Sequence, residues 1–289
     1  MGTRIALLGA GRTAAHLGLA LAAVGQPVQV LGARDADKAR PLAAALGLPV
    51  LSPAAAAAAA DWVFLCVRDA AIEPLCAQLP WRASQLVLHC SGATELNALD
   101  AARLAGAAVA GFHPLQLMAD PLPSSAEALR AFEGIRIGIE AESPWRTELD
   151  ALALALGATP LHLQAGQRAR YHAAANAAAS ALLAPLDLAA RQAAQALSCS
   201  TEQAWEALAP LAEGTLRAAR ARGLAGALSG PLARGDAAVL AAHLQALQGR
   251  DAELYRSLMQ ALLPLAAQRL EPDALEPLIR VLDRAADPS

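Results

Sequence analysis

The stretch that decides the fold is RIALLGAGRTA, residues 4–14. A short apolar run leads directly into a glycine turn, and sequence suited to a helix follows. The order fits the motif G-x-G-x-x-G/A through Gly9, Gly11 and Ala14. In this motif the first glycine permits a tight turn and the second lets the backbone approach a pyrophosphate, while the last small residue lets the helix pack on the strand. The helix N-terminus then offers free N–H groups to the anion.

One such match is a weak signal, because a chance glycine turn can produce it. Here the motif follows a predicted strand, precedes a predicted helix and begins a predicted βαβ unit, which is the context that the motif requires. We therefore predict a dinucleotide site. The residues expected to contact the cofactor at this turn are Gly9, Ala10, Gly11, Arg12 and Thr13.

The end of the second predicted strand bears on which dinucleotide binds. A cofactor without a 2′-phosphate calls for an acidic residue at the tip of this strand, but Gly32 and Ala33 are followed by Arg34. An arginine at this place suits the 2′-phosphate of NADP. The alternative is that Arg34 is an ordinary solvated arginine and Asp35 binds the ribose. We favour NADP.

The first half of the chain alternates short apolar runs with helical stretches, which is typical of βαβ units. Strand signals stop near Gly166, and four or five helices are predicted after it. We expect an α/β fold, with an N-terminal Rossmann doubly wound parallel sheet (residues 1–165) that binds NADP and a C-terminal all-helical domain (166–289) for substrate binding and dimerisation. The expected strands are 4–8, 28–31, 49–51, 62–67, 86–89, 109–111, 135–139 and 161–163, and the expected helices after residue 166 are 167–190, 201–222, 236–248, 251–269 and 272–286.

Composition narrows the range of partners. Of 289 residues 56% are hydrophobic and 17% charged, with a net charge of −3 and 3% aromatic residues. These values indicate a packed globular chain and give no electrostatic case for nucleic acid or an anionic membrane. The four cysteines have no metal-ligand spacing. We expect a cytoplasmic, soluble protein that binds small molecules and holds no metal.

Polar residues follow three of the predicted strands. Ligands of doubly wound sheets bind beyond the carboxyl ends of the strands, so these residues are placed to contact cofactor or substrate. Pro114 biases His113 toward an extended backbone, which suits a side chain aimed across a cleft, although histidines also occur as ordinary loop residues. The residues expected to contact the cofactor here are Val67, Arg68, Asp69, Ser91 and Gly92, and His113 is a candidate catalytic residue.

The helical half supplies further candidates. Arg168, His172, Asn176 and Ser180 are four residues apart, so neighbours in this line share a helix face. A solvent-facing stripe is the alternative, but short polar side chains suit a cleft, and we favour a function for His172 and Asn176. Tyr171 points elsewhere and is expected to pack.

The segment 227–236, ALSGPLARGD, interrupts the helical pattern. We expect a turn over 229–235, with Asp236 as the N-cap of the next helix. Such a turn could present Arg234 to a substrate carboxylate as a bidentate fork. A salt bridge of Arg234 to Asp236 or to the other domain is an equal alternative.

Taken in order, GAGRTA, ARDADKA and DWVFLCVRDAAI resemble the N-terminal domain of the 6-phosphogluconate dehydrogenase-like superfamily, which includes pyrroline-5-carboxylate reductase, ketopantoate reductase and deazaflavin-dependent NADP reductases. Three further stretches resemble one subfamily, in which a Rossmann-like NADP oxidoreductase domain precedes a helical domain of unknown function. They are HCSGA (89–93), GFHPLQ (111–116) and LSGPLARGD (228–236), the last followed by AAHL (241–244). The resemblance spans nearly the whole chain and implies fold and cofactor more firmly than reaction.

The chain departs from this resemblance at one position. Related hydroxyacid dehydrogenases carry a catalytic lysine four residues before an asparagine, and here His172 stands in the place of that lysine, before Asn176. The hypothesis is an NADPH-dependent oxidoreductase that transfers hydride to the ketone or imine of a small carboxylate, with a ketopantoate-like 2-oxo acid as the best guess. His172, or otherwise His113, would supply the proton, Asn176 would orient the carbonyl, and Arg234 would bind the carboxylate.

Two further expectations concern catalysis and assembly. The missing lysine supports an alternative in which the chain is a non-catalytic NADP-binding sensor or scaffold protein. The alanine- and leucine-rich helices offer more apolar surface than one core buries, so we expect a homodimer formed through the second domain.

Overall fold

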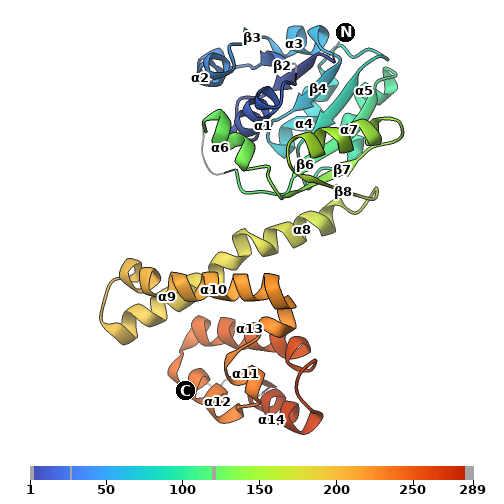
Figure 1. Ribbon diagram of the computed structural model, residues 1–289. Coiled ribbons are helices and arrows are strands. Elements are labelled where there is room, and N and C mark those ends of the chain that lie inside the picture. Colours follow the sequence, from blue (N-terminus) through green and yellow to red (C-terminus); the bar gives the residue numbers. More distant parts are fainter. Residues whose placement is uncertain (1–2, 27, 119–121, 284–289) are drawn as a thin grey trace. The chain divides into compact units, whose positions relative to one another are not determined.

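The computed structural model describes residues 3–26, 28–118 and 122–283. The chain forms two compact units, Met1–Ala177 and Ala178–Ser289, which are described separately (Figure 1). Sequence patterns placed the domain boundary after residue 165. In the structure most of α8 (Arg168–Ala178) belongs to the first unit.

The first unit contains an eight-stranded sheet of order β3-β2-β1-β4-β5-β6-β7-β8. Its strands are short and apolar, as expected for strands that are covered on both faces. They are β1 (Ile5–Leu8), β2 (Val28–Gly32), β3 (Val50–Leu51), β4 (Trp62–Leu65), β5 (Leu86–His89), β6 (Ala108–Pro114), β7 (Arg136–Glu140) and β8 (Thr159–His162).

Every described pair of neighbouring strands is parallel except β6 and β7, which are antiparallel. The expected α/β fold with a doubly wound sheet is confirmed, and the sheet is parallel apart from this pair. A parallel neighbour requires the chain to return to the starting edge of the sheet. Between β6 and β7 the short helix α6 (Ser125–Arg130) packs on α1 instead, and the chain enters β7 running in the opposite direction.

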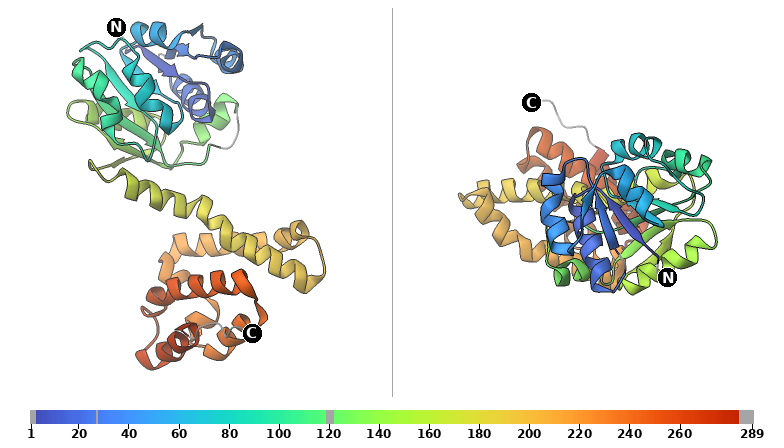
Figure 2. Two further views of the ribbon diagram at one scale, coloured as in Figure 1. Left: turned by 180° about the vertical axis from the view of Figure 1, so that it is seen from behind. Right: turned by 90° about the horizontal axis from the view of Figure 1, so that it is seen from above.

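Helices cover both faces of the sheet (Figures 1 and 2). One apolar core lies under α1 (Arg12–Ala23), α2 (Ala36–Leu46), α6 and α7 (Trp145–Ala155). A second core lies on the opposite face, under α3 (Pro53–Ala59), α4 (Asp69–Ala77), the 3-10 turn Leu96–Leu99 and α5 (Asp100–Leu104). The strand order reverses between β1 and β4, so the crevice at the carboxyl ends of these strands is the expected ligand site of this fold.

Two glycines on neighbouring strands make room for the first turns of α8. His89, Gly111 and Glu140 are register partners on β5, β6 and β7. A Cβ atom at Gly111 would overlap the guanidinium of Arg168, and one at Gly138 would lie 2.8 Å from the hydroxyl oxygen of Tyr171. The missing side chains therefore let α8 pack closely on the sheet, which explains why this helix belongs to the first unit.

The second unit is helical over its described residues. Its apolar core includes Leu232, Leu240, Leu278 and Leu282. The helices are α9 (Leu183–Leu197), α10 (Thr201–Ala227), α11 (Gly230–Arg234), α12 (Ala237–Ala246), α13 (Gly249–Ala266) and α14 (Pro272–Asp283).

Three sequence expectations for this region need correction. The helix predicted over 167–190 is divided by a 3-10 turn at Ser180–Leu182, where Ala179 leaves the helical conformation. The helix predicted to end at residue 222 continues to Ala227 through a kink at Gly223, whose φ of 75° suits glycine. The turn predicted over 229–235 is largely a short helix, α11, which ends at Gly235 in the left-handed conformation.

Candidate functional site

The turn between β1 and α1 has the geometry that a dinucleotide requires. Gly9 has a φ of 116°, and a Cβ atom there would overlap the carbonyl oxygen of Cys66, so no other residue fits without movement. A Cβ atom at Gly11 would meet no described atom within 4 Å. The backbone at Gly11 is therefore open to a ligand.

The N-terminus of α1 suits an anion. Gly11 is the N-cap, no side chain among the described residues caps the helix, and its first turn carries no acidic residue. The first backbone N–H groups are thus left for a ligand, and the helix dipole favours negative charge. Ala10, Arg12 and Thr13 lie at this turn, and Arg12 is exposed. These features fit a pyrophosphate.

Arg34 and Asp35 have different tasks in the structure. The carboxylate of Asp35 accepts a hydrogen bond from the backbone N–H of Lys38 at 3.1 Å and so caps α2. This contact holds the pKa of Asp35 below its usual range. Arg34 is exposed and has no hydrogen bond or ion pair within the described ranges. The Asp35 carboxylate therefore caps α2, while the Arg34 guanidinium is left for a ligand. This arrangement suits a 2′-phosphate.

A pocket of about 200 Å³ joins the dinucleotide turn to the ends of β5 and β6. Its lining includes Arg12 and Thr13 from the start of α1, Cys90 after β5 and His113 on β6. The structure thus brings the predicted cofactor turn and one predicted catalytic histidine into a single pocket.

Two histidines and a tyrosine meet beside Gly92. A Cβ atom at Gly92 would lie 2.8 Å from Cε1 of His113 and 2.8 Å from Nδ1 of His172, so both imidazoles face the space that this glycine leaves. The Nδ1 atom of His113 and the hydroxyl of Tyr171 are hydrogen-bonded at 2.9 Å. Nδ1 of His172 is buried and has no protein partner within the described residues.

Burial controls the charge of two histidines. It lowers the pKa of His113 to about 4, with further contributions from the charges of His172 and Arg168. It also lowers the pKa of His89 to about 3, and Arg168 again adds to the effect. Both imidazoles are therefore neutral at pH 7. The interpretation of His89 as a buried strand-end histidine fits its position, and its Nδ1 atom accepts a hydrogen bond from the backbone N–H of Ser91 at 3.3 Å.

The loop after β5 is fixed by its own polar groups. The Ser91 hydroxyl accepts hydrogen bonds from the backbone N–H groups of Ala93 and Thr94 and donates one to the Thr94 hydroxyl. The side chain of Ser91 is thus engaged in the turn, and Gly92 provides the close approach to a ligand.

The other predicted residues occupy several elements of the two units. Asn176 is exposed one helical turn beyond His172, and Arg234 is exposed at the end of α11 in the second unit. Val67 packs near Gly9, and Arg68 precedes α4 as its N-cap. Asp69, the first residue of α4, raises the pKa of His113 against the larger effect of burial.

Four residues of the site have roles that the sequence did not predict, namely Tyr171, Arg168, Glu140 and Glu95. Tyr171 was expected to pack, but it is hydrogen-bonded to His113. Arg168 was read as one member of a polar stripe, yet it is completely buried and paired with Glu140, while Glu95 binds the backbone at the start of α8. The sequence Arg-x-x-Tyr-His was the one local sign that these residues act together. The partners of Arg168, Glu140 and Glu95, lie 28 and 73 residues away in the chain, so the sequence alone did not reveal them.

Two family models match the chain. Residues 4–92 match the family described as "NADP oxidoreductase coenzyme F420-dependent", and residues 135–262 match "Domain of unknown function (DUF2520)". The chain joins an NADP oxidoreductase domain to a DUF2520 domain. The predicted family resemblance and the NADP cofactor are confirmed at this level. No curated protein matches the chain.

Solved structures share the fold. An imine reductase from Pseudomonas sp. has a TM-score of 0.64 and 17% identity, covering 98% of this chain and 100% of that chain. A pyrroline-5-carboxylate reductase from Coxiella burnetii has a TM-score of 0.59 and 16% identity, with 99% and 100% covered. A reductive aminase from Aspergillus terreus, in complex with NADPH and ethyl-5-oxohexanoate, has a TM-score of 0.59 and 19% identity, with 98% and 93% covered. At these identities the likeness establishes the fold.

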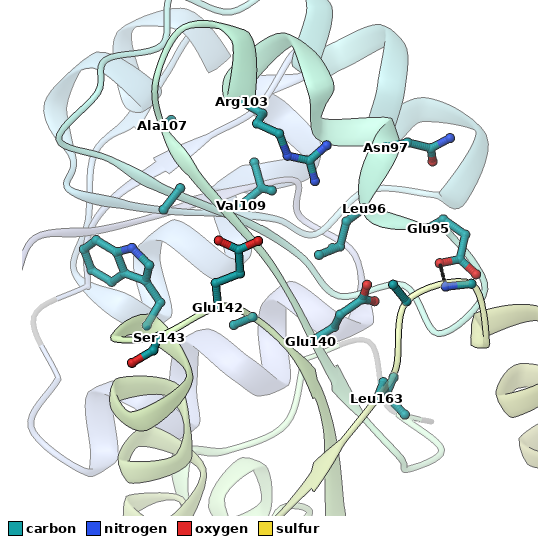
Figure 3. Close-up of a pocket in the computed structure, with 15 residues that line it drawn as sticks. Glu95, Leu96, Asn97, Arg103, Ala107, Val109, Glu140, Glu142, Ser143 and Leu163 are labelled. Atoms are coloured by element: carbon teal, nitrogen blue, oxygen red, sulfur yellow. Dashed lines mark hydrogen bonds between the residues drawn. The ribbon is translucent and has the colours of Figure 1, made fainter.

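The first unit has a second, larger hollow of about 750 Å³ (Figure 3). Glu140 and Glu142 at the end of β7 and Arg103 of α5 turn their charged groups toward it (Figure 3). None of the predicted site residues lines this hollow. Its border includes Glu95 and Gly166, whose hydrogen bond lies at the start of α8.

We predict that the first unit loses stability in mild acid. Because His89 and His113 have folded-state pKa values of about 3 and about 4, the unfolded chain, with histidine pKa values near about 6.5, takes up protons that the folded chain does not. The free energy of unfolding should fall as the pH drops from about 6.5 toward about 4, by at most about 1.4 kcal/mol per pH unit for each histidine.

Urea unfolding as a function of pH measures this effect. His89→Gln should flatten the dependence, whereas His162→Gln, at an exposed histidine, should not. Equal slopes for the wild type and the His89 variant would contradict the assignment.

Proposed function

We propose that the chain is an NADPH-dependent reductase of a small carboxylate that carries a ketone or an imine. The observation that carries the proposal is the convergence of His113 and His172 on Gly92, beside a pocket that also includes the dinucleotide turn. A substrate that accepted hydride beside Gly92 would therefore also lie next to an imidazole nitrogen that could supply the proton.

The cofactor would be held by backbone and by two arginines. Gly9, Ala10 and Gly11 and the first N–H groups of α1 would receive the pyrophosphate, with Arg12 and Thr13 beside it. Arg34 would bind the 2′-phosphate, and Val67, Arg68, Asp69, Ser91 and Gly92 would border the remainder. When bound there, NADPH supplies the hydride, and the chain's own residues supply position and proton.

The two histidines would have different roles. Burial raises the pKa of Tyr171, so its phenol stays protonated and can donate to Nδ1 of His113. Neutral His113 would then carry its proton on Nε2, which lies 2.9 Å from the Cβ position of Gly92. With a pKa of about 4, His113 is suited to donate a hydrogen bond rather than to be a charged acid at pH 7. We therefore assign the proton transfer to His172 and the orientation of the carbonyl or imine to His113, with Asn176 assisting.

The proposed substrate class rests on Arg234. Arg234 is exposed at the end of α11, while Asp236 accepts a hydrogen bond from the backbone N–H of Val239 at 3.1 Å and so caps α12. Arg234 therefore remains available for a carboxylate. The names of the similar structures (imine reductase, pyrroline-5-carboxylate reductase and reductive aminase) support testing imines beside ketopantoate-like 2-oxo acids.

A non-catalytic NADP-binding sensor or scaffold is the second candidate. The observation in its favour is that histidine occupies the position of the lysine that related dehydrogenases use. A sensor would bind NADPH but would not oxidise it with any member of a panel of 2-oxo acids and imines. Oxidation with any member of that panel would exclude it.

We predict that Arg34→Asp lowers the preference for NADPH over NADH by about ten- to a hundredfold, the value of one charge-assisted contact. The measurement is the ratio of the two dissociation constants, followed by nicotinamide fluorescence. Arg40→Asp makes the same charge change at an exposed position of α2 and should leave the ratio unchanged. If the Arg34 variant kept the wild-type ratio, the 2′-phosphate assignment would be wrong.

Replacement of both histidines should abolish most turnover. General acid catalysis contributes about 10²–10⁴ in rate, so we predict that His113→Ala with His172→Ala lowers kcat more than about tenfold on the best substrate of the panel. The affinity for NADPH should stay near that of the wild type. His162→Ala is the matched control, since His162 is exposed and bound to Asp150. A smaller loss in the double variant would refute the proton-donor assignment.

We also propose a homodimer formed through the helical unit. Five of its leucines, Leu183, Leu197, Leu211, Leu216 and Leu224, each expose more than half of their surface. The stretch Arg168–Leu197 is long and apolar enough to cross a membrane by length and composition alone, but it contains Asp187 and Arg191, and little of its most apolar part is buried. Burial against a second copy would account for its apolar surface.

Light scattering at micromolar concentration tests the dimer. We predict twice the mass of the 29.5 kDa chain, and a shift toward the single-chain mass in Leu211→Glu with Leu224→Glu. Leu104→Glu, at an exposed leucine of the first unit, should leave the mass unchanged. A single-chain mass for the wild type would overturn the proposal.

A further inference from the structure

Arg168 is a completely buried cation at the start of α8. Its Nε atom donates to a carboxylate oxygen of Glu140 at 2.6 Å, and Nη1 donates to the carbonyl oxygen of Ser91 at 2.9 Å. Its Nη2 atom is buried without a hydrogen-bond partner among the described residues. A charge is costly to bury unless it is paired and hydrogen-bonded, so the guanidinium is confined to this one position.

The backbone of the same turn is held by a second carboxylate. One oxygen of Glu95 accepts the N–H of Gly166 at 3.1 Å, and the other accepts the N–H of Arg168 at 3.0 Å (Figure 3 shows the contact with Gly166). A carboxylate at a helix N-terminus satisfies unpaired N–H groups and complements the helix dipole. Arg168 and Glu95 thus attach the first turn of α8 to the loop after β5 from two sides.

The attachment fixes the residues that the site uses. Tyr171 and His172 follow Arg168 by three and four positions, so they lie on the next turn of the same helix. Both meet the β5 loop and β6 at short range: Tyr171 bonds to His113, and Nδ1 of His172 faces Gly92. Moving the first turn of α8 would therefore move both side chains relative to His113.

We propose that Arg168 is a positioning residue, which, through Glu140 and the Ser91 carbonyl and together with Glu95, holds Tyr171 and His172 of α8 against His113 and Gly92. The inference rests on the proposed function only in assigning these three side chains to a reductase site.

The guanidinium also acts on His113 through its charge. The charged or titratable groups that influence His113 are Arg168 and His172 on α8, which lower its pKa, and Asp69 on α4, which raises it. Tyr171, the remaining partner, is hydrogen-bonded to His113. Loss of the Arg168 charge should therefore raise the pKa of His113, an effect that a residue with a purely structural role at the helix end would not produce.

Histidine titration by NMR on the full chain, without substrate, tests the proposal. Arg168→Gln should move the His113 midpoint upward from about 4, toward about 6.5. Amide exchange at residues 169–172 should become about tenfold faster, as expected for the loss of a charge-assisted hydrogen bond. Arg170→Gln removes the same charge from the same turn at an exposed position and should change neither quantity.

Two outcomes would overturn the proposal. The first is a folded Arg168→Gln variant with a wild-type His113 midpoint. If that variant does not fold, Arg168→Lys decides, since it keeps the buried charge but loses the planar fork that reaches both Glu140 and the Ser91 carbonyl. Unchanged amide exchange at Tyr171 and His172 would then refute the positioning role. Neither measurement needs a reducible substrate, so failure of the proposed reductase function would leave this test intact.

Discussion

The guanidinium of Arg168 lies against Gly111 of β6, in space that any side chain there would occupy, and much of the site follows from that constraint. Any larger residue at position 111 would place a Cβ atom inside the guanidinium. With glycine there, Arg168 reaches Glu140 on one side and the Ser91 carbonyl on the other. A helix that would otherwise start the second domain is thereby attached to the sheet, and the described contacts place it in the first unit.

That attachment has an electrostatic consequence. Burial keeps the imidazoles of His89 and His113 neutral, and the charge of Arg168 acts in the same direction on both. The site therefore combines a neutral, tyrosine-bound His113 with His172, whose Nδ1 atom has no partner among the described residues. Two imidazoles in such different surroundings are suited to separate tasks, one orienting and one transferring a proton.

The cofactor turn depends on backbone rather than on side chains. The Cys66 carbonyl, directly after β4, excludes any side chain at Gly9, while the space at Gly11 stays open. The Asp35 carboxylate caps α2 and is therefore not free to bind a ribose, so the group left for a ligand at the tip of β2 is the cation Arg34. The two features are independent, yet both favour a phosphate-bearing dinucleotide, in agreement with the family match of residues 4–92.

Local sequence determined the glycine turn, the strands of the parallel part of the sheet and the helical character of the second half, because each depends on residues close together in the chain. It also selected His113, His172 and Gly92. It did not determine the antiparallel entry of β7, the α8 attachment or the role of Tyr171. The direction of β7 follows from the packing of α6 on α1. The α8 attachment and the position of Tyr171 depend on the pairing of Arg168 with Glu140 and of Glu95 with the start of α8, residues far apart in sequence that only the folded sheet brings within hydrogen-bonding distance.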